Sequence, residues 1–323
     1  MNGGIMNGVT GRPPLGWVRE PWIWSYLGAV LVFSTIAIFS ADPVGTLTAS
    51  ASFASFFMLV GFGQMLVITL GPGNIDLSIP YAIGLAGFVA MKTMNAADSG
   101  IALGFLTGLA TGAGIGAFNF ALIRALRVPP MIATLASGFI VQTLSIVFFR
   151  GLQIKPPPGL AAFVDIRLGP VPILFILVLA VAVAMHLVLT RTPYGRYIHA
   201  IGQNLKAASL ASINVNMNKL VTYVLCGLFS GLTGLLLSAF GGGVTLGMGH
   251  EYLLNSIAVP VIGGCSIAGG NSNVPGILGA SLLLLLILYL LDILGFTVGL
   301  RYVLTGLVIL GIIFASGRSR GRS

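Results

Sequence analysis

Apolar and polar positions alternate along the chain in long blocks, with apolar runs separated by short polar or Gly/Pro-rich segments. A helix that crosses a membrane needs about 20 mostly apolar residues. The pattern predicts ten such spans, and the third and eighth are short and adjoin Gly/Pro-rich interruptions, which predicts bent or discontinuous helices there. The spans are Trp22–Ala41, Ser52–Leu70, Ile79–Met94, Gly100–Leu122, Met131–Phe149, Val171–Thr190, Leu220–Phe240, Leu253–Ile267, Pro275–Leu294 and Thr297–Ser316.

Two of these apolar stretches resemble each other. LVITLGPGNIDLSIPYAIGLAG includes the end of the second span, and LLLSAFGGGVTLGMGHEYLLNSIA includes the end of the seventh. Each has an apolar run, a glycine-rich triplet, a polar patch and a second apolar run. An offset of five spans would place the two halves upside down to each other, as in transporters built from inverted repeats with broken helices. The alternative is chance similarity between Gly-rich apolar segments.

Composition places the chain in the membrane. Apolar residues make up 56% of the sequence and charged residues only 7%, whereas soluble domains carry about 25% charged residues. So few charges could not cover the core of a soluble protein of this length. We therefore expect an all-α polytopic membrane protein, with a tail at 1–21, one transmembrane domain at 22–316 and a basic tail at 317–323.

The basic residues indicate an orientation, because Lys and Arg gather on the cytoplasmic side of membrane proteins. With the N-terminus inside, eleven basic residues fall in cytoplasmic segments and five outside, which predicts that both termini are cytoplasmic. This scatter among loops argues against a nucleic-acid partner. The eleven are Arg12, Arg19, Arg124, Arg127, Arg191, Arg196, Lys206, Lys219, Arg318, Arg320 and Arg322, and the five are Lys92, Arg150, Lys155, Arg167 and Arg301.

The segment 191–219 is the longest polar interruption, and it contains four basic residues and no acid. Thr192 suits a helix N-cap and Pro193 the first helical position. Gly202 is typical of a helix end, and Asn204 can cap a second short helix with Leu205, Ala208 and Ala211 on one side. The pattern predicts a broken amphipathic helix presented to something in the cytoplasm; the alternative is an ordinary basic loop.

Four stretches, in this order, resemble ATP-binding-cassette (ABC) transporter permeases of the ribose, xylose and galactoside type. They are GPGNIDLS, NFALIRALRVPPMIATL, YGRYIHAIGQNLKAASLASINV and AVPVIGGCSIAGG, and the likeness covers about Leu59–Ala315. The resemblance implies a bacterial inner-membrane importer with an ATPase subunit, a periplasmic sugar-binding protein and a second permease copy, identical or paralogous. It also implies that the third stretch couples to the ATPase, through Tyr194, Gly195, Arg196, Ile201, Gly202, Ala207 and Ala208.

Polar residues at membrane depth are costly and are often functional. Asp76 is the clearest, in the stretch that matches a Gly-Ile-Asp-Leu-Ser run of the family, with Asn74 where the family usually has glycine. Asp76 either contributes to the solute pathway or only caps the next helix. The pathway candidates are Asn74, Asp76, Ser78, Asn119 and Asn255, and helix–helix hydrogen bonding is the alternative role for the last two.

Enzyme motifs are absent from the sequence. There is no Gly-x-x-x-x-Gly-Lys-Ser/Thr loop, no zinc-protease helix and no Gly-x-Ser-x-Gly elbow. The three histidines lie in different segments, so we expect neither a metal nor a cofactor. The predicted function is monosaccharide import, with ATP hydrolysis in a partner subunit. The alternatives are the same architecture for branched-chain amino acids or another small polar solute, and an autonomous ion-coupled carrier.

Overall fold

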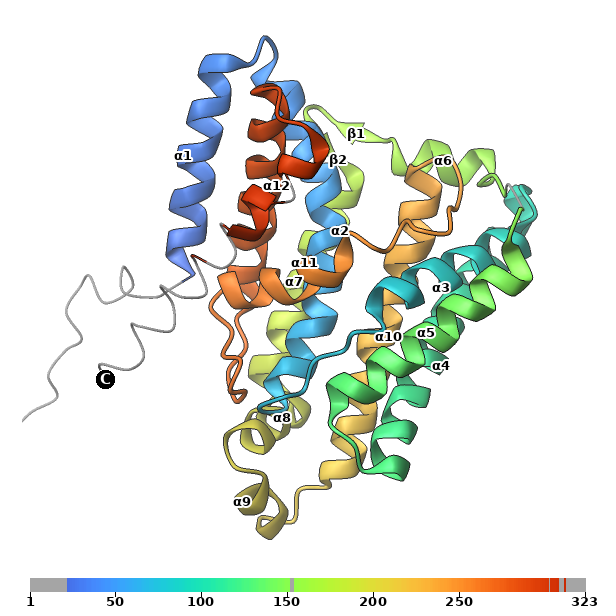
Figure 1. Cartoon of the computed structure of the whole chain (residues 1–323), viewed down its shortest axis with the longest axis vertical. Coiled ribbons are helices and arrows are strands. Elements are labelled where there is room, and N and C mark those ends of the chain that lie inside the picture. Colours follow the sequence, from blue (N-terminus) through green and yellow to red (C-terminus); the bar gives the residue numbers. More distant parts are fainter. Residues whose placement is uncertain (1–21, 152–153, 302, 308–310, 312–323) are drawn as a thin grey trace, which may run out of the picture.

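The computed structural model describes residues 22–151, 154–301, 303–307 and 311, and most of these residues are helical (Figure 1). One antiparallel pair of two-residue strands, β1 (Arg167–Leu168) and β2 (Val171–Pro172), interrupts the helices. The helices are α1 (Ile23–Phe39), α2 (Pro43–Thr69), α3 (Ile79–Met94), the 3-10 turn η2 (Asp98–Gly100), α4 (Ile101–Leu126), α5 (Pro130–Phe149), α6 (Pro158–Val164), α7 (Ile173–Arg191), α8 (Pro193–Gln203), α9 (Leu205–Leu210), α10 (Val215–Phe240), α11 (Tyr252–Ile262) and α12 (Val274–Ile293).

Six helical segments are long and apolar enough to cross a membrane: α2, η2 with α4, α5, α7, α10 and α12. Further apolar helices, α1, α3 and α11 among them, are shorter. The protein is therefore an α-helical, multi-pass membrane protein. The count of ten spans stays a prediction, and the predicted tails and part of the tenth span lie outside the described residues.

Helix α2 forms the centre of the bundle. It packs against α7, α10, α11 and α12, and almost its whole surface is buried. Large apolar side chains on the outer helices point away from the bundle instead, as Leu31, Leu106 and Val147 do. Lipid replaces water as the solvent for these side chains, so their exposure stabilises the fold in the membrane.

Helices α4 and α10 approach so closely that only glycine fits at their contact. A Cβ atom on Gly112 would overlap the carbonyl oxygen of Gly227, and one on Gly116 would overlap that of Tyr223. The reverse also holds, because a Cβ on Gly227 would overlap the carbonyl oxygen of Gly112. Small residues at four-residue spacing allow this backbone approach in membrane helices.

The two Gly-rich interruptions are non-helical, as predicted. Segment 71–78 separates α2 from α3, and segment 241–251 separates α10 from α11. The helices that follow each break cross to the other half, since α3 packs on α10 and α11 packs on α2. The second break also packs on the start of α3, because a Cβ on Gly249 would overlap the carbonyl oxygen of Pro80. An inverted repeat would produce this exchange, and the repeat itself stays a prediction.

Several predicted boundaries are wrong for identifiable reasons. Helix α2 begins nine residues before Ser52, because the Asp42 carboxylate accepts a hydrogen bond from the Gly45 N–H at 2.9 Å and caps it ahead of Pro43. Helix α10 begins at Val215 rather than Leu220, with Asn214 as its cap. Val171 lies in β2 and does not start a helix. Helix α11 ends at Ile262, before Gly263 and Gly264.

Candidate translocation and coupling sites

The first break owes its shape to its glycines. Gly71 and Gly73 have φ values of +123° and +76°, which side chains other than hydrogen rarely allow. The backbone therefore leaves α2 in an irregular path that ends at Ser78, just before α3. This path brings Asp76 against the interior of the bundle, where its side chain is 2% exposed.

The Asp76 carboxylate accepts hydrogen bonds from three directions. The backbone N–H and the hydroxyl of Ser78 donate to its Oδ1 at 2.9 and 2.6 Å. The Asn119 amide of α4 donates to both carboxylate oxygens at 3.3 and 3.2 Å, and to the Ser78 hydroxyl oxygen at 2.7 Å. Among the described residues no Lys or Arg pairs with Asp76.

Asn119 extends this polar network to α5, because its amide oxygen accepts a hydrogen bond from the Ser137 hydroxyl. Thr134, one turn earlier on α5, accepts from the Leu77 N–H at 3.0 Å and donates to the Ile75 carbonyl at 3.2 Å. Gln64 of α2 accepts from the Asp76 N–H at 3.2 Å. The first break is thus held by side chains from α2, α4 and α5.

The five pathway candidates fall into two places. Asp76, Ser78 and Asn119 lie together in the buried network, and the Asn74 amide closes a turn on the Gly71 carbonyl at 3.1 Å. Asn255 lies apart on α11, where its amide donates to the Glu251 carbonyl at 2.8 Å. It lines a cavity of about 630 Å3 together with His250, Glu251, Arg301 and others. Only Asn255 of the five faces an open space of this size.

In the predicted coupling segment, Thr192 caps α8 with Pro193 at its first position, and Asn204 caps α9 by accepting from the Ala207 N–H at 3.0 Å. These predictions are confirmed. Helix α8 does not end at Gly202, however, and continues through Gln203. The glycine serves packing instead, because a Cβ there would overlap the Thr69 carbonyl oxygen and the Gly270 nitrogen.

Helix α8 is fastened to the bundle along one face. Ile198 and Ile201 are buried, and the Tyr194 hydroxyl pairs with the Thr222 hydroxyl of α10 at 2.9 Å. Burial raises the pKa of Tyr194 to about 12, against a smaller opposing effect of this hydrogen bond, so the phenol stays protonated at neutral pH. A Cβ on Gly195 would overlap the Leu189 carbonyl oxygen. The α7–α8 corner therefore has little room to bend.

The loop 263–273, which contains the family-like stretch SIAGG, holds the other end of α8. The Gly270 N–H donates to the Thr69 carbonyl at 2.9 Å, and the Gln203 amide donates to the Gly270 carbonyl at 3.4 Å. His199 Nε2 and the Ser272 hydroxyl are 2.8 Å apart. This loop, the end of α2 and α8 thus form one unit directly beside the first break.

The outward side of α8 and α9 differs in character. Arg196, Tyr197, Lys206 and Ala207 are exposed, and the apolar side chains of Leu205 and Leu210 are 48% and 87% exposed. Of the predicted coupling residues, Gly195, Ile201, Gly202 and Ala208 are buried against this chain itself. Leu205 and Ala211 do not share the buried side of Ala208, because α9 is only six residues long.

The sequence matches a known protein family. Residues 46–313 match the family described as "Branched-chain amino acid transport system / permease component". The chain belongs to this permease family. The resemblance to ABC permeases is confirmed. The family description names a permease component of a transport system.

Individual relatives agree. The permease is 30% identical to the galactose/methyl galactoside import permease protein MglC of Escherichia coli K12, over 94% of this chain and 96% of the relative. It is 30% identical to the ribose import permease protein RbsC of the same organism, over 94% and 95%. It is also 30% identical to the autoinducer 2 import system permease protein LsrC of Yersinia enterocolitica, over 85% and 76%. No solved structure matches the chain.

Sequence reasoning missed several residues of these sites. Thr134 and Ser137 are short polar residues in apolar helices, a pattern that equally fits helix-to-helix hydrogen bonds. His199 and Ser272 are 73 positions apart, and no local pattern relates them. Leu205 and Leu210 are ordinary apolar residues in sequence. Among the described residues, no group of three or more His, Cys, Asp or Glu is placed to hold a metal ion.

Proposed function

We propose that the permease is the membrane-spanning subunit of an ATP-driven importer, and that it passes a monosaccharide delivered by a periplasmic binding protein. The observation that carries this proposal is the similarity, over nearly the whole chain, to permeases named for galactoside and ribose import. An ATP-binding-cassette subunit supplies the energy. The coupling segment then transmits its motion to the bundle.

The surface of α8 and α9 supports the coupling part of the proposal. Two exposed leucines and two basic residues project from short helices that are rigidly fastened to the bundle. An apolar centre with a charged rim is typical of a protein interface. Within the permease, Gly202 then contacts the end of α2 next to the first break. A push on α8 would therefore reach the network around Asp76.

A second solute class is favoured by one specific observation, the family description, which names branched-chain amino acids. An ion-coupled carrier receives less support. The intramembrane acid that it would require is Asp76, whose carboxylate is already engaged by Ser78 and Asn119. Both readings are outcomes of the same experiment.

The experiment reconstitutes the permease with its ATPase in proteoliposomes and adds the binding protein. Uptake of radiolabelled ribose, galactose and leucine is measured with and without ATP. We expect ATP-dependent uptake of a sugar that requires the binding protein. Uptake of leucine but of neither sugar would show that the solute is an amino acid. Uptake by the permease alone in an ion gradient would show that the protein is an ion-coupled carrier.

The basic residues support an orientation with α8 and α9 in the cytoplasm and both termini on the same side. Single cysteines on a variant without native cysteines test it, at Lys206 on α9 and at Lys155 on the opposite end. An impermeant thiol reagent applied to intact cells should label the cysteine at position 155 and spare the one at 206. Labelling of position 206 alone would show that the protein has the opposite orientation in the membrane.

A further inference from the structure

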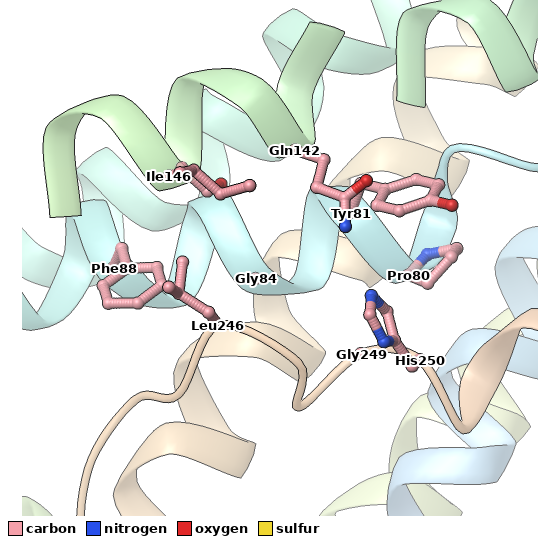
Figure 2. Close-up of a pocket in the computed structure, with 10 residues that line it drawn as sticks. Pro80, Tyr81, Gly84, Phe88, Gln142, Ile146, Leu246, Gly249 and His250 are labelled. Atoms are coloured by element: carbon pink, nitrogen blue, oxygen red, sulfur yellow. The ribbon is translucent and has the colours of Figure 1, made fainter. Parts of the chain in front are cut away.

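A second cavity lies where the second break meets the start of α3. This recess has a volume of about 120 Å3 and lies between α3, α5 and segment 241–251. Its lining includes Tyr81, Phe88, Gln142, Leu246 and His250 (Figure 2). None of them is among the pathway residues proposed above from the sequence.

The position of the recess follows from the backbone contact between the second break and the start of α3. Gly249 packs directly on the Pro80 carbonyl, so the neighbouring residues His250 and Tyr81 face each other. Their ring centroids are 6.1 Å apart with an interplanar angle of 75°. One residue comes from each half of the chain. Any movement of the second break relative to α3 must therefore change the recess.

Among the residues that the structure describes, three polar side chains of the recess make no hydrogen bond, whereas the fourth, Ser145, donates to the Val141 carbonyl at 3.0 Å. The Tyr81 hydroxyl, the Gln142 amide and the His250 imidazole make no side-chain hydrogen bond within the described part of the chain. An amide alone offers two donors and two acceptor sites. In the network around Asp76, by contrast, the carboxylate and the Asn119 amide are satisfied. His250 is exposed and Tyr81 and Gln142 are partly exposed, so these groups are open to bind water or a solute.

The chemistry of the lining discriminates between solutes. Gln142 and Tyr81 lie on one side and His250 on the other, while Phe88, Ile146 and Leu246 form an apolar end (Figure 2). Neutral donors and acceptors beside apolar and aromatic surface suit hydroxyl groups on a carbon ring. The lining contains no Asp, Glu, Lys or Arg. An amino acid would bring two full charges into a site without a counter-charge.

We propose that the recess is the point at which the permease contacts the sugar ring during passage, with Gln142, Tyr81 and His250 as hydrogen-bonding groups. This inference rests on the proposed function. His250 also lines the 630 Å3 cavity that contains Asn255, so the two spaces share a wall. A solute that enters the larger cavity would reach the recess past this imidazole.

The test uses the complete reconstituted transporter and the Gln142→Leu and Tyr81→Phe variants. Thr143→Val is the control, since Thr143 lies next to Gln142 on α5 but outside the recess and bonds its own helix at 2.8 Å. A leucine side chain at position 142 cannot hydrogen-bond sugar hydroxyls, so sugar uptake should fall about three- to tenfold. Assembly with the ATPase and basal ATP hydrolysis should stay at wild-type level, which a merely structural role would not predict.

A histidine pair supplies a second readout. His250→Gln should slow sugar uptake, and His186→Gln, a change at an exposed histidine of α7, should not. Tyr81→Phe removes one oxygen only and keeps the test informative if Gln142→Leu fails to fold in size-exclusion analysis. Sugar uptake at the wild-type level by Tyr81→Phe and His250→Gln would show that the recess is not the sugar-contact site, and the proposal of sugar import would still stand. Leucine uptake alone by the wild-type transporter would overturn both.

Discussion

Asp76 shows how a charged residue is accommodated in this bundle. Its oxygens accept hydrogen bonds, and the Asn119 amide donates to them while its own oxygen accepts from Ser137. The direction of each bond is therefore specified. An amide at position 76 would keep its oxygen toward Ser78 but would place a donor opposite the Asn119 donor at the position of Oδ2.

We predict that Asp76→Asn lowers the free energy of unfolding by about 1–3 kcal/mol, because a buried donor loses its acceptor. Transport should fall, while membrane insertion and ATPase binding survive. The swap Asp76→Asn with Asn119→Asp restores a donor opposite an acceptor and should recover most of the stability. Thermal unfolding in detergent measures both. A swap no more stable than the single variant would contradict this role of the network.

At the scale of elements, α8 and α9 have two sides with different tasks. The buried side holds α8 to α2, α10 and loop 263–273, and the exposed side carries Leu205 and Leu210. We therefore expect a substitution at Gly202 to lower the stability of the permease itself. A substitution at an exposed leucine should affect only the binding of a partner. Sequence reasoning expected Gly202 and Ala208 to contact the ATPase, and their burial assigns them to the first side.

We predict that Leu205→Ser with Leu210→Ser weakens co-purification of the ATPase at least about tenfold, since exposed apolar anchors often dominate an interface. The melting temperature of the permease alone should stay unchanged. Ala207→Asp, on the same exposed side, should act in the same way. Full ATPase recovery with the double serine variant would place the docking surface elsewhere.

Two glycine variants separate packing from docking. Gly202→Val should destabilise the isolated permease, because its side chain would overlap the Thr69 and Gly270 backbones. Gly114→Ala on α4 is the matched control, with nothing within 4 Å of the added Cβ. An unchanged melting temperature for Gly202→Val would show that the α8 contact yields easily.

At the scale of the whole molecule, the interior of the bundle is filled. Helix α2 is buried by its neighbours, and both cavities that bear on transport lie at the edges of the second break. Within the described residues, neither of these cavities runs through the centre of a single copy. The pathway is better placed between two copies related by a two-fold axis.

We predict two permease copies in the complete transporter. Native mass measurement with the ATPase bound should give this stoichiometry, and cross-linking in membranes should join two permease chains. A transport-competent complex with one permease chain would refute it. An identical or a paralogous second chain would satisfy the prediction.

The sequence by itself determined the class, the family and much of the helix pattern. Charge-poor composition requires lipid as solvent, and local chemistry such as the Thr192, Asn204 and Asn214 caps marks helix starts without tertiary contacts. The two Gly-rich breaks were predictable for the same reason, because positive φ angles at Gly71 and Gly73 are a local property. Only the first nine residues of α2 were missed, since its first turns are rich in small and polar residues.

Only the tertiary structure decided which polar residues are paired and which are free. Asp76 and Asn119 are 43 positions apart, and Gly202 and Gly270 are 68 apart, so no periodicity relates them. In sequence Asp76 is a candidate for solute contact and Gln142 an ordinary intramembrane amide. Packing reverses this order, because three helices enclose and satisfy Asp76, while the contact of the second break with α3 leaves Gln142, Tyr81 and His250 without side-chain hydrogen bonds beside a cavity.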